Sequence, residues 1–88
     1  MTKRIWKYDL EITESQFIHM PEDAKILSVE NQYGDLCLWA LVDPEKRHTI
    51  RDIHIIGTGN PIHGTPKLTF IGTVIIKPLV WHVFERMR

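Results

Sequence analysis

The sequence predicts an all-β fold, a small antiparallel sandwich or barrel of six to seven short strands with no substantial helix. Apolar residues either alternate with polar ones or form short runs of strand length. Turn-forming residues interrupt these runs about every ten residues, which is typical of sandwiches and small barrels. No segment carries the apolar spacing of an amphipathic helix. A length of 88 residues predicts a single domain over 1–88.

The first part of the chain predicts three short strands. Residues 5–10 alternate between large apolar and charged side chains, which indicates a strand with one buried face. Residues 16–20 form a second strand, which Pro21 ends because proline cannot donate to a strand ladder. The segment 21–24 has the character of a helix start, but it is long enough for one turn at most. Residues 25–30 form the third strand.

The middle of the chain predicts a hairpin and two more strands. The segment 31–35 contains Gly34, which adopts positive φ readily and therefore indicates a tight turn. Residues 36–42 are apolar at every position, so we expect both faces of this strand to be covered. A polar turn at 43–47 follows, and residues 49–56 alternate again as a strand.

The last part of the chain predicts one long loop and two strands. Residues 57–66 are polar and rich in glycine and proline, and such loops on a rigid scaffold commonly carry binding function. Residues 67–76 form a strand in which Gly72 indicates a bulge or a close approach of another strand. Residues 79–84 form the final strand, and residues 85–88 form a charged tail.

Three of the predicted strands are apolar on both faces, at 36–42, 68–76 and 79–84. A two-layer domain normally buries one face of each sheet. Either these strands lie inside a strongly wrapped barrel, or their outer faces pack against another chain. We favour the second alternative, which predicts a homo-oligomer.

Composition excludes several classes of protein. The 11 basic and 11 acidic residues cancel, which argues against general nucleic-acid binding. Cys37 is the single cysteine, so no intrachain disulfide can form, and its apolar neighbours predict a buried thiol. No apolar run reaches membrane-spanning length, so we expect no membrane partner. Residues 1–4 lead into a mixed strand and not into a signal peptide, which predicts a cytoplasmic setting.

No residue pattern specifies catalysis, a metal or a cofactor. The chain has five histidines, which are His19, His48, His54, His63 and His82. None of them stands at metal-ligand spacing from cysteine or carboxylate residues. A threonine–histidine–aspartate set can be drawn from Thr58 or Thr65 with His63 and Asp52, but any threonine-rich loop allows this. A hydrolase using His63 or His82 therefore has little support, and we expect a non-enzymatic protein.

The loop at 57–66 is the candidate binding site. Gly57-Thr58-Gly59 resembles the start of a phosphate-cradling loop, in which glycine amides approach an anion. The phosphate-loop and dinucleotide signatures are incomplete, and no helix follows, so the loop could equally be a wide hairpin connection. The candidate ligand-binding residues are Arg51, His54, Gly57, Thr58, Gly59, Asn60, His63, Trp39 and Trp81.

Six segments together resemble a family of small bacteriophage and prophage proteins of unassigned function. They are IWKYDL at 5–10, MPEDAKILSV at 20–29, LCLWALVDP at 36–44, GTGNPI at 57–62, FIGT at 70–73 and LVWHVFE at 79–85. The resemblance covers nearly the whole chain, in the same order. It implies a phage origin and expression in a bacterial host cytoplasm, and it brings no catalytic residues.

These observations lead to two functional hypotheses. The first is a non-enzymatic, oligomeric phage protein that binds and sequesters a small anionic host ligand, such as a defence signalling nucleotide. Glycine amides of the loop would hold phosphate, and Trp39 or Trp81 would stack on a base. The alternative is a protein-binding module that inhibits a host protein or serves in a phage structural assembly.

Overall fold

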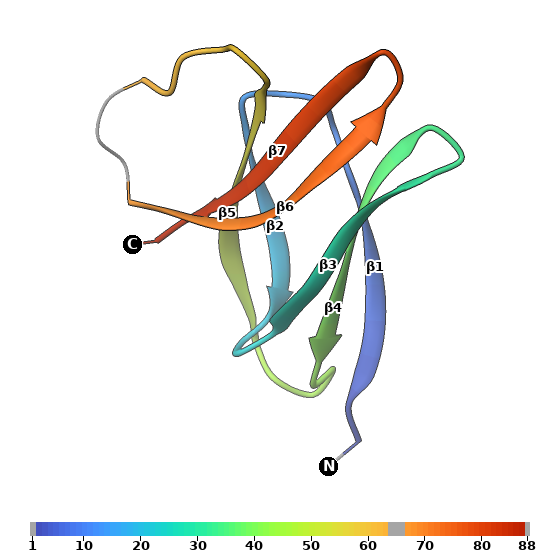
Figure 1. Cartoon of the computed structure of the whole chain (residues 1–88). Coiled ribbons are helices and arrows are strands. Elements are labelled where there is room, and N and C mark those ends of the chain that lie inside the picture. The colour runs from blue at the N-terminus through green and yellow to red at the C-terminus, as the bar shows by residue number, and fades with distance from the viewer. Residues whose placement is uncertain (1, 64–66, 88) are drawn as a thin grey trace.

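The computed structural model describes residues 2–63 and 67–87, and this part of the chain contains seven strands and no helix. The strands form two antiparallel sheets that pack face to face as a sandwich (Figure 1). This confirms the prediction of an all-β fold. In chain order the strands are β1 (Arg4–Leu10), β2 (Ser15–Pro21), β3 (Lys25–Gln32), β4 (Asp35–Val42), β5 (His48–Gly57), β6 (Leu68–Ile76) and β7 (Leu79–Arg86).

The two sheets differ in size and in how the chain builds them. The three-stranded sheet has the order β1-β4-β3, and the four-stranded sheet has the order β2-β5-β7-β6. Strand β7 lies between β5 and β6 and is antiparallel to both, so β5 and β6 run parallel to each other. The connection between β5 and β6 is therefore a crossover and not the wide hairpin considered from the sequence.

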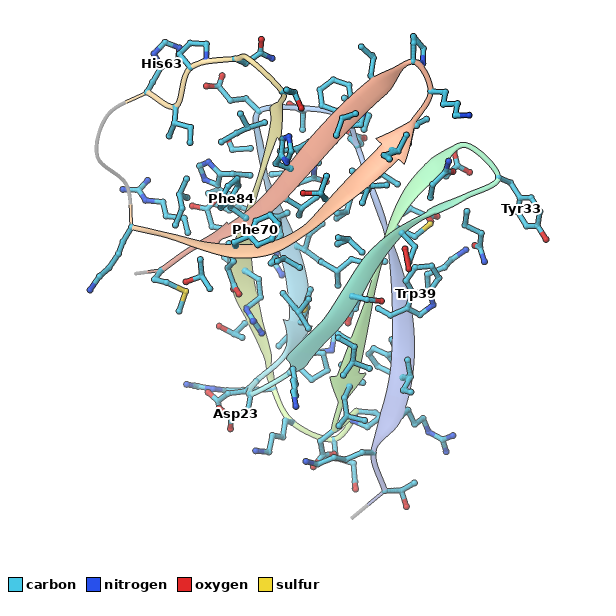
Figure 2. The ribbon with its side chains drawn as sticks, viewed as in Figure 1. Asp23, Tyr33, Trp39, His63, Phe70 and Phe84 are labelled. Carbon is cyan, nitrogen blue, oxygen red and sulfur yellow. The ribbon has the colours of Figure 1, made fainter. Side chains whose placement is uncertain are left out.

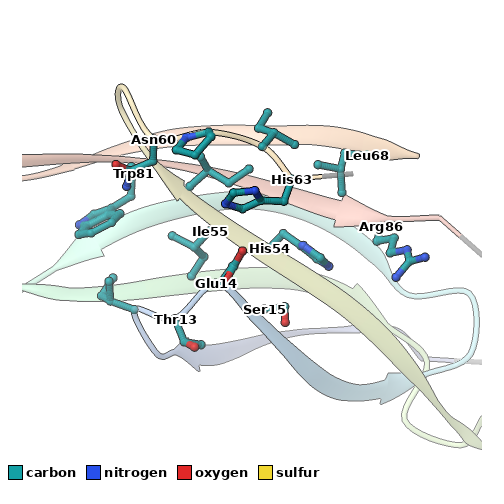
Figure 3. Close-up of a pocket in the computed structure, with 15 residues that line it drawn as sticks. Thr13, Glu14, Ser15, His54, Ile55, Asn60, His63, Leu68, Trp81 and Arg86 are labelled. Carbon is teal, nitrogen blue, oxygen red and sulfur yellow. The ribbon is translucent and has the colours of Figure 1, made fainter. Parts of the chain in front are cut away.

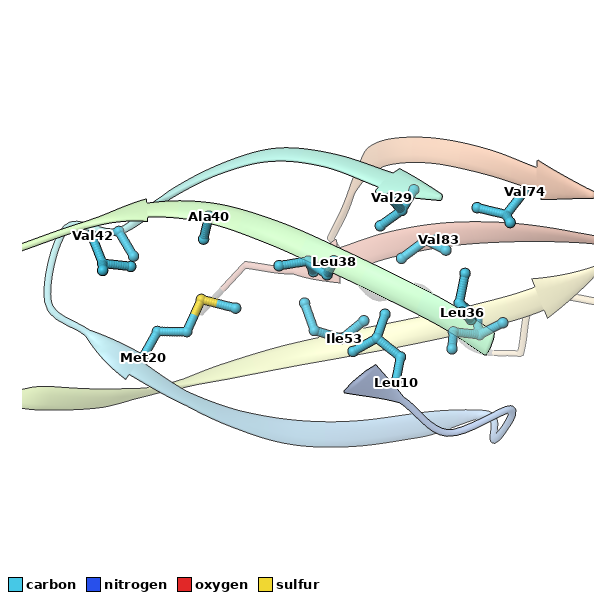
Figure 4. Close-up of a cluster of buried hydrophobic side chains, with 12 residues drawn as sticks. Leu10, Met20, Val29, Leu36, Leu38, Ala40, Val42, Ile53, Val74 and Val83 are labelled. Atoms are coloured by element: carbon cyan, nitrogen blue, oxygen red, sulfur yellow. The ribbon is translucent and has the colours of Figure 1, made fainter. Parts of the chain in front are cut away.

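The core lies between the sheets and follows the two-residue alternation of the strands. On β4, Leu36, Leu38, Ala40 and Val42 are all at most 2% exposed and point toward the four-stranded sheet (Figure 4). Met20 and other side chains of that sheet meet them in one continuous cluster. Core packing thus comes from one face of each strand, as a two-layer sandwich requires.

The outer face of β4 accounts for its unbroken apolar run. Cys37, Trp39 and Leu41 alternate with the core residues and lie on the outside of the three-stranded sheet. Cys37 is fully buried, and Trp39 and Leu41 are half-buried. The sandwich is not a wrapped barrel, so the first of the two alternatives for the doubly apolar strands is wrong.

A two-residue turn joins β3 to β4. Its central residues, Tyr33 and Gly34, have φ values of 53° and 89°, as a hairpin turn with right-handed strand twist requires. The Asn31 Oδ1 atom accepts a hydrogen bond from the Gly34 amide at 2.7 Å. Tyr33 stands at the tip of the hairpin and is 99% exposed (Figure 2). The hairpin predicted at 31–35 is therefore confirmed.

Strand β6 approaches the edge of β3 at Gly72. A Cβ atom on Gly72 would lie 2.8 Å from the Cγ2 atom of Val29. The register of β6 against β7 shifts between Phe70 and Gly72, and the register of β3 against β4 shifts between Ile26 and Ser28. Both features predicted for Gly72, a bulge and a close approach, are present.

The predicted tail at 85–88 is wrong in its first half. Glu85 and Arg86 are the last residues of β7 and pair with Ile53 and Asp52 of β5, respectively. Glu85 faces inward, where Arg51 of β5 forms an ion pair with it. The charged residues therefore extend the strand instead of ending it.

Candidate functional site

The start of the crossover loop is a tight turn. The Asn60 amide donates a hydrogen bond to the Gly57 carbonyl at 3.0 Å, and Gly59 has a φ of 87°. Positive φ at this third position is typical of a type II turn and favours glycine. The Thr58 amide donates to the Val80 carbonyl at 3.2 Å. The turn thus engages the Thr58 and Asn60 amides within the fold, whereas the phosphate-cradling prediction concerned the glycine amides.

A cavity of about 720 Å³ lies beside this turn. Strand β2 begins at Ser15, opposite His54, so β5 continues to Gly57 beyond the end of its neighbour. The cavity occupies this position, between the loop residues 60–63 and residues 12–15, which end the β1–β2 connection and begin β2 (Figure 3). Its size is in the range of pockets that hold small organic ligands.

The lining of the cavity changes in character from one end to the other. Trp81 lies at one end, and His54 and Arg86 lie toward the other (Figure 3). Glu14 lies between the two ends, and His63 faces it from the loop. Apolar side chains complete the wall, and they are Ile12, Ile55, Ile56, Pro61, Ile62 and Leu68.

A contact with Asp52 orients His54 at this site. The Nε2 atom of His54 lies 3.0 Å from the Oδ1 atom of Asp52, and the two side chains are 18% and 6% exposed. Alternation along β5 places both side chains on the outer face of the four-stranded sheet. Because Asp52 occupies Nε2, the Nδ1 atom is the ring nitrogen left for another partner.

A second histidine is held in a chain of hydroxyl groups. The Nε2 atom of His82 lies 2.7 Å from the Thr58 Oγ1 atom, and its Nδ1 atom lies 2.9 Å from the Thr73 Oγ1 atom. Both ring nitrogens are thus engaged, and His82 does not line the cavity. This arrangement ties the start of the crossover loop to β6 and β7.

Arg51 lies apart from the cavity. Its Nε and NH2 atoms donate to the two carboxylate oxygens of Glu85, and its NH1 atom donates to the Ala24 carbonyl at 2.8 Å. The hydrogen bond to Glu85 raises the pKa of the Arg51 guanidinium. Arg51 lines a separate cavity of about 440 Å³ between β3 and β6. Its positive charge is paired with the Glu85 carboxylate within the fold.

The structure brings together five of the nine predicted site residues. Around the cavity lie His54, Gly57, Asn60, His63 and Trp81. Outside its lining lie Arg51, Thr58, Gly59 and Trp39, the last of which is on the opposite sheet. The predicted loop residues 64–66, which include Thr65, lie outside the described residues.

Two charged residues that line the cavity were not predicted from the sequence. Glu14 was assigned to a break between strands, and Arg86 was assigned to a charged tail. No local pattern marks either residue, because they reach the cavity through the pairing of β2 and β7 with β5. Their contribution depends on tertiary structure alone.

Two further findings concern metal sites and membrane-spanning helices. In the parts of the chain that the structure covers, 2–63 and 67–87, no cluster of three or more His, Cys, Asp or Glu could hold a metal ion. Within the same residues there is no helix of the length and hydropathy needed to cross a membrane.

Comparisons with known proteins identify the family. Searches of curated proteins and of solved structures found no significant match. The model of one family, described as Domain of unknown function (DUF7352), matches residues 1–88. The chain therefore belongs to the DUF7352 family.

Proposed function

We propose that the protein binds and sequesters a small anionic ligand in the cavity beside the end of β5. The observation that carries this proposal is the order of side chains along the cavity. Trp81 lies at one end, Glu14 lies in the middle, and His54 and Arg86 lie toward the other end. A ligand that suits this order has a flat ring, then hydroxyl groups, then a negatively charged group.

A nucleotide has this order of groups. An aromatic side chain such as Trp81 stacks on a base, with a contribution of roughly 1–3 kcal/mol. A carboxylate such as that of Glu14 accepts hydrogen bonds from ribose hydroxyls. The guanidinium of Arg86 donates to phosphate oxygens in a fixed planar geometry. Each part of the lining therefore has a matching part in the ligand.

The resemblance to phage and prophage proteins narrows the proposal further. We propose that the chain is of phage origin and acts in the cytoplasm of a bacterial host. Its ligand would then be a host nucleotide used in defence signalling, such as a cyclic dinucleotide or an ADP-ribose-type molecule. The protein would act by holding this ligand without changing it.

Isothermal titration calorimetry and thermal unfolding with cyclic dinucleotides, ADP-ribose and AMP test this function. We expect at least one of them to bind, and a ligand at 100 times its Kd raises stability by about 2.7 kcal/mol. Chromatography of the ligand after incubation should recover it unchanged.

Matched arginine variants locate the site. Arg86→Ala should weaken binding at least about tenfold, because it removes a charge-assisted contact to phosphate. Arg4→Ala, an exposed arginine on β1 in the other sheet, should leave binding unchanged. The proposal fails if none of these nucleotides binds, if both variants have equal effects, or if the ligand is consumed.

A further inference from the structure

An aromatic ring and an amide lie side by side at one end of the cavity (Figure 3). They approach each other there because Gly57 has no side chain. A Cβ atom on Gly57 would lie 2.8 Å from the Asn60 Nδ2 atom and 3.2 Å from the Trp81 Cζ3 atom. A base that stacks on the Trp81 ring would have its edge near the Asn60 amide, which both donates and accepts hydrogen bonds. This end therefore suits the base of a nucleotide.

The backbone of β5 fixes Glu14 in the middle of the cavity. The Ile55 amide donates a hydrogen bond to the Glu14 carbonyl at 3.2 Å, and the next residue, Ser15, pairs with His54. The Glu14 carboxylate has no hydrogen bond or ion pair with any described residue. Its backbone is thus held in place while its carboxylate is available to a ligand.

Arg86 is available in the same way toward the other end of the cavity. Its guanidinium forms no ion pair with a described residue, whereas Arg51 and Glu85 pair with each other. Glu14 and Arg86 both line the cavity and do not pair with each other. A ligand therefore meets one separate carboxylate and one separate guanidinium.

The position of the carboxylate distinguishes two classes of nucleotide. With the base at Trp81 and the 5′-phosphate at Arg86, the ribose lies beside Glu14. In a linear nucleotide such as AMP or ADP-ribose, this ribose has free 2′- and 3′-hydroxyl groups, and both can donate to a carboxylate. In a cyclic dinucleotide one of these oxygens belongs to a phosphodiester, which is negatively charged and has no O–H group to donate.

We propose that the cavity binds linear nucleotides with a free ribose diol and that Glu14 excludes cyclic dinucleotides. This selection rests on the proposed function, because it concerns the same cavity. A carboxylate placed beside a phosphodiester opposes binding by like-charge repulsion, which is a general means of excluding a competing ligand. A cyclic dinucleotide also has two bases and two phosphates, for which the described lining offers one indole ring and one guanidinium.

Isothermal titration calorimetry with nucleotides of matched base tests the selection. Cyclic di-AMP is compared with AMP, and cyclic di-GMP is compared with GMP. We expect the Kd of each cyclic dinucleotide to be at least about tenfold larger than that of its linear counterpart. The Kd of 2′-deoxy-AMP should exceed that of AMP by about threefold or more, because one O–H donor to the carboxylate is lost.

Glu14→Gln tests the role of the carboxylate. Glutamine has a similar size, carries no charge, and has an amide that donates to phosphodiester oxygens. The ratio of the two Kd values, cyclic to linear, should therefore fall by about tenfold. Glu11→Gln is the matched control and should leave this ratio unchanged, because Glu11 is an exposed residue of the same connection that does not line the cavity.

The outcomes separate this selection from the proposed function. Cyclic dinucleotides that bind as tightly as linear ones would overturn the selection and leave the proposed function standing. A ratio that Glu14→Gln does not change, or that Glu11→Gln changes equally, would do the same. If no nucleotide of either class binds, the proposed function fails and the selection fails with it.

Discussion

Replacement of Gly72 by alanine tests the packing of β6 against β3. The new Cβ atom would lie 2.8 Å from the Cγ2 atom of Val29, which is 6% exposed and therefore has little room to move. Overpacking of this kind costs about 1–3 kcal/mol. Alanine also restricts the unfolded chain, which offsets about 0.4–1 kcal/mol. We expect Gly72→Ala to lower the free energy of unfolding by about 1–2 kcal/mol.

Urea denaturation and thermal unfolding measure this loss. For a domain of this size, a loss of about 1–2 kcal/mol corresponds to a fall in Tm of about 4–16 °C. The backbone of Gly72 does not lie in the left-handed region, so the contact with Val29, and not backbone strain, causes the loss of stability.

A double-mutant cycle with Val29→Ala isolates that contact. Val29→Ala removes the Cγ2 atom, so the cost of Gly72→Ala should fall by at least about 1 kcal/mol in this background. The reasoning is refuted if Gly72→Ala is neutral or stabilising in the original chain. It is also refuted if Gly72→Ala costs the same whether residue 29 is valine or alanine.

Two further predictions concern buried polar groups. Glu85→Gln should destabilise the fold by about 3 kcal/mol in urea denaturation, because it leaves the Arg51 guanidinium, 20% exposed, without its carboxylate. Glu22→Gln is the control, because it removes an ion pair to Arg47, which is 84% exposed. It should lower the free energy of unfolding by less than about 1 kcal/mol. Equal losses of stability in the two variants would contradict the role of burial. Burial, with a smaller effect from the hydrogen bond to Asp9, raises the pKa of the Cys37 thiol. The thiol therefore stays protonated at neutral pH, and mass spectrometry should find iodoacetamide modification in urea but almost none in buffer; rapid modification of the folded chain would show that Cys37 is accessible.

The sequence alone determined the strands and the short turns of this protein, apart from the end of β7. The strand at 5–10 and the hairpin around Gly34 depend on neighbouring residues, through alternation and positive φ, and both were predicted within a few positions. The role of Gly72 was also predicted, because glycine weakens the interior of a strand and is typical there of a bulge or a close approach.

Only the tertiary structure decided the pairing of distant strands, and with it the candidate site. Because β7 lies between β5 and β6, the glycine-rich segment is a crossover loop and not a hairpin. The same pairing brings Glu14 and Arg86 to one cavity and leaves Trp39 on the opposite sheet. These relations join residues far apart in the chain, and no local pattern encodes which strand edges meet.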